Sequence, residues 1–223
     1  MESIHRRIFR ESFPYDFVGE TLRLLINTYK LVWADLERRY PLPEGYGEIH
    51  DLFPHELRGQ FNYEWRKLAG RYAGIVGRSL TNSTGGAYHT EIVSKQAVLE
   101  VEAVETPKSM RRFKRVSYRQ DLVKACQLNM FEKTEHQGVD AEDLDNKLLY
   151  GVLLHGFPQS RSPGFAFVGF PKQDATGYED VINLFHYYPE VLKLYEEPVE
   201  PEQELDIRLK PSALEESEDQ ESG

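Results

Sequence analysis

Cysteine is almost missing from this 223-residue chain, and long apolar runs are missing altogether. The single cysteine, Cys126, has no partner for an intramolecular disulfide, which favours a reducing, cytoplasmic setting. No apolar stretch approaches the ~20 residues that a membrane-spanning helix needs, so no membrane partner is expected. The first residues are basic but contain no apolar core segment, which argues against a secretory signal.

The residue spacings that mark common catalytic and metal sites are also missing. The seven histidines form no H-E-x-x-H pair, and one cysteine cannot build a Cys/His zinc site. No metal or cofactor is therefore expected, and an enzyme is the least favoured function class. Two histidines remain as candidates for that class. His155 follows an apolar run and would form the edge of a site, and His89, with Glu91 and Lys95, loosely resembles the residues of a metal-dependent nuclease.

Negative charge is concentrated at the C-terminal end. Residues 196–223 hold 11 acidic and two basic residues, which is −9 of the net charge of −10 and leaves −1 for residues 1–195. Aromatic residues are absent from this segment, and glutamate, proline and serine are frequent in it. This composition is typical of disorder. We therefore expect one domain over residues 1–195, followed by a disordered acidic tail over 196–223.

The N-terminal third predicts two long helices after an irregular segment over residues 1–15. The first helix runs from Asp16, as its N-cap, to Tyr40. The second runs from Asp51 to Leu80 and could break near Gly70–Gly77. Apolar residues recur at steps of three or four along the first helix: Val18, Leu22, Leu25, Tyr29, Val32, Leu36 and Tyr40.

The second half of the chain predicts a sheet. Leu148–Leu154 is apolar on both faces, as in a central strand, and Phe165–Phe170 is its partner in a hairpin. In residues 92–104, apolar residues alternate with Glu100 and Glu102, which favours a half-exposed strand, although a helix remains open. A helix over about 174–188 and an edge strand over 191–195 complete the prediction. The expected fold is α+β, with two long N-terminal helices packed on a small, mostly antiparallel sheet.

The string Gly164–Phe170, GFAFVGF, resembles the signature of the RNA-recognition motif, K/R-G-F/Y-G/A-F-V-x-F/Y. Seven of the eight positions match, and Pro163 replaces the basic first residue. The resemblance implies that Phe165 and Phe167 stack on unpaired bases from one face of a strand. Ala166, Val168 and Phe170 would then pack against helices on the other face. The alternative is an ordinary buried aromatic strand.

A basic run, Lys108–Arg119, carries six lysines and arginines and no acidic residue. Interleaved aromatic residues make it suitable for binding phosphates and stacking on bases. The leading hypothesis is therefore a non-enzymatic protein that binds single-stranded nucleic acid, or a regulatory protein. The rival is a protein–protein module that uses the 16–40 helix and the acidic tail. The residues expected to bind nucleic acid are Arg111, Arg112, Lys114, Arg115, Arg119, Phe165 and Phe167.

Overall fold

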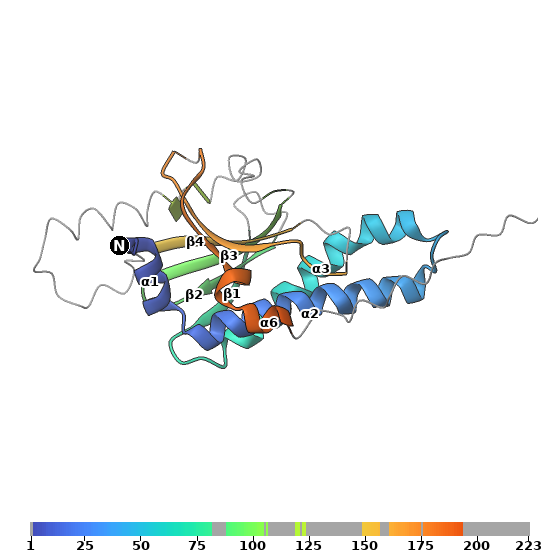
Figure 1. Cartoon of the computed structure of the whole chain (residues 1–223), viewed down its shortest axis with the longest axis horizontal. Helices are drawn as coiled ribbons and strands as arrows, with labels where there is room; N and C mark the ends of the chain where they lie inside the picture. The colour runs from blue at the N-terminus through green and yellow to red at the C-terminus, as the bar shows by residue number, and fades with distance from the viewer. Residues whose placement is uncertain are drawn as a thin grey trace, which may run out of the picture.

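A computed structural model describes residues 2–81, 88–104, 106, 119–120, 122–123, 149–156, 161–174 and 176–193. Its centre is a six-stranded sheet in which the strands lie side by side in sequence order (Figure 1). Neighbouring strands are antiparallel except β3 and β4, which are parallel. The strands are β1 Val76–Thr81, β2 Tyr88–Val93, β3 Ala97–Val104, β4 Leu149–Gly156, β5 Ala166–Pro171 and β6 Tyr178–Asn183. The predicted α+β fold with a mostly antiparallel sheet is confirmed.

Helices pack on one face of this sheet. Leu99, Leu153 and Val168 point from three strands into one core with the apolar sides of the helices. Figure 1 shows the two long helices, α2 and α3, side by side, with α1 against the sheet. The described helices are α1 Ile4–Ser12, α2 Tyr15–Arg39, α3 Tyr46–Ala69, α5 Leu184–Tyr187 and α6 Pro189–Lys193. None of them is long and apolar enough to cross a membrane.

The apolar stripe predicted for residues 16–40 is the buried side of α2. Leu22, Leu25 and Leu36 have no exposed surface, because α3 and the sheet cover them. Trp65 of α3 donates a hydrogen bond from Nε1 to Thr21 Oγ1 of α2 at 3.1 Å, which gives its one polar atom a partner inside the core. The stripe therefore packs within the chain and does not form an exposed docking surface.

The irregular segment predicted before residue 16 is wrong, because α1 occupies most of it. Ser3 caps the helix by accepting a hydrogen bond from the Arg6 backbone N–H. The helix is fixed to the sheet by Arg6, whose guanidinium donates to both carboxylate oxygens of Asp180 at 2.8 Å. Asp180 lies 174 residues away in sequence, so local patterns could not reveal the contact that stabilises α1.

The second helix is shifted relative to the prediction. It begins at Tyr46 after Gly45, so Asp51 is not its cap, and it ends at Ala69, so residues 76–81 form β1 instead of a helix. Gly70–Gly77, where a break was predicted, contains the connection from the end of α3 to the start of β1. Gly77 permits a close approach of β1 to α3, because a Cβ there would lie 2.5 Å from the Arg66 Cα.

Two further predictions near the C-terminus are wrong. Residues 178–183 form strand β6, which pairs with β5, and the expected helix is limited to the single turn of α5. Residues 189–193 form α6, so the edge strand predicted over 191–195 is not observed in its described part. The helix that the RNA-recognition resemblance requires after Phe170 is therefore replaced by a strand. Pairing with β5 outweighs the helical spacing of the apolar residues here.

A second, smaller apolar cluster lies on the sheet face opposite the helices. It contains Val98, Tyr150, Val152 and Leu154, with Phe165, Phe167 and Tyr178 packed against it. Val123, which lies between β3 and β4 in the sequence, also belongs to this cluster. The candidate site lies beside this cluster.

Candidate metal centre

Three buried carboxylates lie together on the sheet face opposite the helices. Glu91 of β2 faces Glu100 of β3 directly across the antiparallel ladder. Glu102 follows two residues later on the same face of β3, because side chains alternate along a strand. These residues are only 2%, 1% and 7% exposed, respectively. The strand predicted over residues 92–104 is observed as β3 from residue 97, whereas residues 92 and 93 belong to β2. Its predicted half-exposed character is wrong, since the glutamates are buried and Val101 is the more exposed residue.

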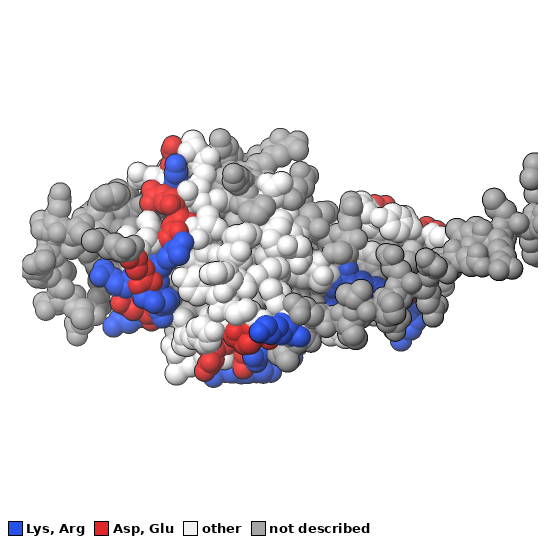
Figure 2. Space-filling view, viewed as in Figure 1, with Lys and Arg blue, Asp and Glu red and all other residues white. Residues whose placement is uncertain are grey.

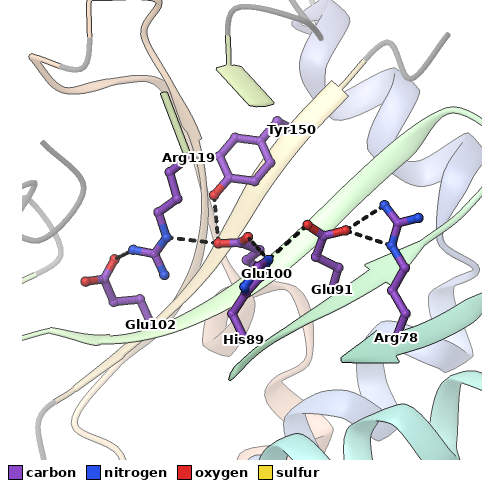
Figure 3. Close-up of polar contacts among 7 residues, drawn as sticks. All are labelled: Arg78, His89, Glu91, Glu100, Glu102, Arg119 and Tyr150. Atoms are coloured by element: carbon purple, nitrogen blue, oxygen red, sulfur yellow. Dashed lines mark hydrogen bonds and ion pairs between the residues drawn. The ribbon is translucent and has the colours of Figure 1, made fainter. Parts of the chain in front are cut away.

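Two arginines bind the outer sides of this carboxylate cluster. Arg78 of β1 donates from Nε to Glu91 Oε2 at 2.8 Å. Arg119 donates from Nε to Glu100 Oε2 at 2.9 Å and from Nη1 to Glu102 (Figure 3). Buried ions need compensating partners, so these arginines make the burial of three glutamates possible.

The remaining oxygens of Glu91 and Glu100 converge on His89. Its Nε2 is 3.2 Å from Glu91 Oε1 and 3.7 Å from Glu100 Oε1. All three ligand atoms lie within 4.8 Å of one another. Neighbouring ligands around an octahedral ion with bonds of ~2.1 Å are about 3 Å apart. The spacing therefore suits a divalent cation held by one imidazole and two carboxylates.

Tyr150 orients the central carboxylate of the cluster. Its hydroxyl donates to Glu100 Oε2 at 2.9 Å, from a position on β4 with only 4% exposure. Burial raises the pKa of Glu100, and this effect is opposed by Arg119 and Tyr150. Such partners behind a carboxylate ligand fix its orientation toward an ion.

The chemistry of the donor set narrows the choice of ion. One imidazole nitrogen with carboxylate oxygens suits Mn²⁺, Fe²⁺, Co²⁺ or Zn²⁺ better than Mg²⁺, which prefers oxygen ligands alone. On the β1 side of the cluster, the Arg78 side chain is 47% exposed, whereas the Glu91 side chain that it binds is only 3% exposed.

The residues predicted as site residues are placed in three different ways. Arg111, Arg112, Lys114 and Arg115 lie outside the described residues. Arg119 is described, and its guanidinium is paired with buried carboxylates. Phe165 and Phe167 are half-buried, with ring centroids 5.7 Å apart, on the same face as the metal centre. As predicted, Ala166, Val168 and Phe170 face the helical core.

The two histidines considered as site residues have opposite environments. His155 is buried on the helical side, where its Nδ1 lies 2.8 Å from the Tyr29 hydroxyl, and burial lowers its pKa to about 4. It therefore packs as a neutral core residue. Of the three residues that loosely resemble a metal-dependent nuclease, His89 and Glu91 lie in the candidate metal centre, whereas Lys95 is an exposed residue of the β2–β3 turn. The sequence had led us to expect no metal.

Sequence reasoning missed four members of this cluster: Arg78, Glu100, Glu102 and Tyr150. The available signal was the pair of glutamates in residues 92–104, whose alternation with apolar residues predicted a half-exposed strand. Comparisons with known proteins add no further assignment, since the chain matches no family model, no curated protein and no solved structure.

Proposed function

We propose that this protein is a divalent-metal-dependent hydrolase that cleaves phosphodiester bonds in nucleic acid. The observation that carries the proposal is the convergence of His89, Glu91 and Glu100 within 4.8 Å, in a buried cluster held by two arginines. His89, Glu91 and Glu100 would hold the cation, which would polarise a phosphoryl oxygen and lower the pKa of a bound water. In the proposed hydrolysis, water would add to phosphorus as the bond to the leaving sugar oxygen breaks. One water proton would pass to that oxygen and the other to solvent.

Nucleic acid is the favoured substrate because of the sequence that leads into the site. Arg119, the last residue of the basic run Lys108–Arg119, is paired with Glu100 and Glu102. Five further lysines and arginines of that run precede it in the sequence. We propose that this run binds the phosphates of the substrate, because its lysines and arginines precede Arg119 in the sequence. In the view of Figure 2, lysines and arginines on the left and at the bottom of the molecule lie next to acidic residues.

The test is cleavage of labelled single-stranded DNA and RNA oligonucleotides by the full chain with Mn²⁺, Mg²⁺ or a chelator. We expect cleavage with Mn²⁺ that is abolished by chelation and by either His89→Ala or Glu91→Gln. The matched controls are His50→Gln and Glu64→Gln, because both residues lie on the outside of α3 away from the cluster. Lack of both Mn²⁺ binding and cleavage by the wild-type chain would overturn the proposal.

The second candidate is a protein that binds single-stranded nucleic acid without cleaving it. It is favoured by Phe165 and Phe167, whose half-buried rings lie on the same sheet face as the metal centre. Salt-sensitive binding that is lost when Arg111, Arg112 and Arg115 are changed to glutamate, with no cleavage in any metal, would favour this candidate over the hydrolase.

A further inference from the structure

The two arginines of the cluster differ in exposure and in the number of carboxylates that they bind. Arg119, with a side chain that is 9% exposed, contacts both Glu100 and Glu102. Arg78, with a side chain that is 47% exposed, forms an ion pair with Glu91 and with no other described residue. Compensation of buried charge accounts for the position of Arg119. Arg78 extends from a buried carboxylate to the surface, so part of its guanidinium faces solvent.

The guanidinium of Arg78 binds Glu91 through only one of its edges. Nε lies 2.8 Å and Nη2 lies 2.6 Å from the same oxygen, Glu91 Oε2. A guanidinium has five N–H donors, and two neighbouring nitrogens can bind two oxygens of one phosphate. Within the described part of the chain, Nη1 has no acceptor. The edge formed by Nη1 and Nη2 is therefore available for a ligand.

We infer that Arg78 binds a phosphate of the substrate through this Nη1–Nη2 edge, while Glu91 holds the other edge. This inference rests on the proposed function. Glu91 lies between the arginine and the proposed ion, because Oε2 accepts from Arg78 whereas Oε1 is 3.2 Å from His89 Nε2 (Figure 3). A phosphate offers several oxygens, so one can bind the ion and another the guanidinium. Arg78 thereby orients the phosphate beside the ion.

The charge of Glu91 supports this role. Without an ion, this carboxylate compensates the positive charge of Arg78. A divalent ion bound to Glu91 takes up part of the negative charge of the same carboxylate. Arg78 then carries positive charge that Glu91 no longer balances fully, and a phosphodiester with its single negative charge supplies the missing anion. We therefore expect phosphate to bind to Arg78 more tightly with the ion than without it.

The experiment compares the wild-type chain with Arg78→Gln and Arg78→Lys, each loaded with Mn²⁺. Cleavage of labelled single-stranded DNA gives kcat and KM, and broadening of the phosphorus NMR signal by Mn²⁺ gives the dissociation constant of thymidine monophosphate. For Arg78→Gln we expect KM and this dissociation constant to rise about 10- to 100-fold, the effect of losing a charged hydrogen-bond donor. The lysine variant keeps the charge without the paired donors, so a smaller rise is expected. Arg38→Gln is the control, because Arg38 is an exposed arginine that pairs with Asp35 on α2.

The affinity for Mn²⁺ separates phosphate binding from a merely structural role. Arg78→Gln should bind Mn²⁺ at least as tightly as the wild type, because a competing cation beside Glu91 is removed. A parallel loss of Mn²⁺ affinity, or an unchanged dissociation constant for thymidine monophosphate, overturns the inference. If Arg78→Gln does not fold, NMR of the wild-type chain with Zn²⁺ decides. The guanidinium signals of Arg78, identified by their absence in Arg78→Lys, should shift when thymidine monophosphate is added, and constant signals overturn the inference.

The two proposals fail in different ways. A chain that binds Mn²⁺ and thymidine monophosphate through Arg78 but cleaves no oligonucleotide defeats the hydrolase proposal and leaves this phosphate site intact. A chain that cleaves oligonucleotides with the same KM in the wild type and in Arg78→Gln defeats the inference alone. Thymidine monophosphate that binds equally well with and without Mn²⁺ also defeats the inference, because the ion and Arg78 are expected to bind the same phosphate.

Discussion

Glu91 and Glu100 face each other across the β2–β3 ladder, and both are almost completely buried. Like charges directly opposite each other in a sheet destabilise it. Here each carboxylate uses one oxygen to bind an arginine and turns the other toward His89. This division of the oxygens is what distinguishes a candidate cation site from a simple chain of salt bridges.

A divalent ion between these two carboxylates is expected to stabilise the fold. At a Mn²⁺ concentration 100 times the dissociation constant, the free energy of unfolding should rise by about 2.7 kcal/mol, which is several degrees in melting temperature. Differential scanning calorimetry with Mn²⁺ or with K⁺ at equal ionic strength measures this shift. His89→Ala should remove it while His50→Gln retains it, and equal shifts in both variants would place the ion elsewhere.

Acid should destabilise the protein through His155. Burial lowers its pKa from 6.5 to about 4, so the unfolded chain binds a proton more readily than the folded chain. The stabilising contribution is fully present above pH 6.5 and is lost as the pH falls toward 4, by about 3 kcal/mol in all. Urea unfolding at pH 7.0, 5.5 and 4.5 measures this loss. His155→Gln should flatten the pH dependence, whereas exposed His50→Gln should not, and parallel profiles for all three chains would contradict the prediction.

Two glycines should respond in opposite directions to replacement by alanine. A Cβ at Gly77 would lie 2.5 Å from the Arg66 Cα, so β1 must move away from α3, and we expect a loss of about 1–3 kcal/mol. A Cβ at Gly59, inside α3, meets nothing within 4 Å, so Gly59→Ala should stabilise the helix by up to about 1 kcal/mol. Guanidinium unfolding of the two variants tests both signs. A neutral Gly77→Ala would show that β1 can shift without cost.

Removing the charge of Asp180 should release α1 from the sheet. Arg6 donates to both oxygens of this carboxylate and to the Val181 carbonyl, which lowers the pKa of Asp180 to about 2. Because the pair is partly exposed, Asp180→Asn should cost only about 1–2 kcal/mol. Hydrogen exchange should show faster exchange in α1 with little change in α2. Exposed Asp174→Asn is the control, and a uniform change in exchange over the whole chain would argue against local release.

The aromatic pair of β5 is expected to strengthen nucleic-acid binding without affecting metal binding. Phe167 pairs with Leu154, which pairs with Glu102, so it lies two strands, or about 10 Å, from Glu102 on the same face, and one strand further from His89 and Glu91. Phe165→Ala and Phe167→Ala should each weaken binding of single-stranded DNA by about 1–3 kcal/mol. Fluorescence anisotropy measures this, with exposed Tyr63→Ala as control. Unchanged affinity in both variants would limit the pair to packing.

The parts of the fold that were predicted correctly have strong local periodicity. The 3.6-residue repeat of α2 predicted a helix, and the continuous apolar run of β4 predicted a central strand. Each pattern buries its apolar side chains in only one type of element. The predictions failed for segments whose secondary structure or position depends on residues far away in the sequence. β6 has helical spacing of apolar residues but pairs with β5, and α1 depends on Asp180 for its anchor. Gly77 shows the same limit, since its close contact with Arg66 exists only after folding.

The sequence alone determined the α+β class, the apolar face of α2, the central hairpin, and the two faces of β5. It offered His89 with Glu91 only as a loose pattern within the least favoured function class. Only the tertiary structure decided that Glu100, Glu102 and Arg119 join them, because strand register and the β3–β4 connection bring together residues from separate parts of the chain. A glutamate between valines is solvated if that strand face is open and buried if an arginine covers it. Composition is the same in both cases, so burial and charge pairing had to come from the fold.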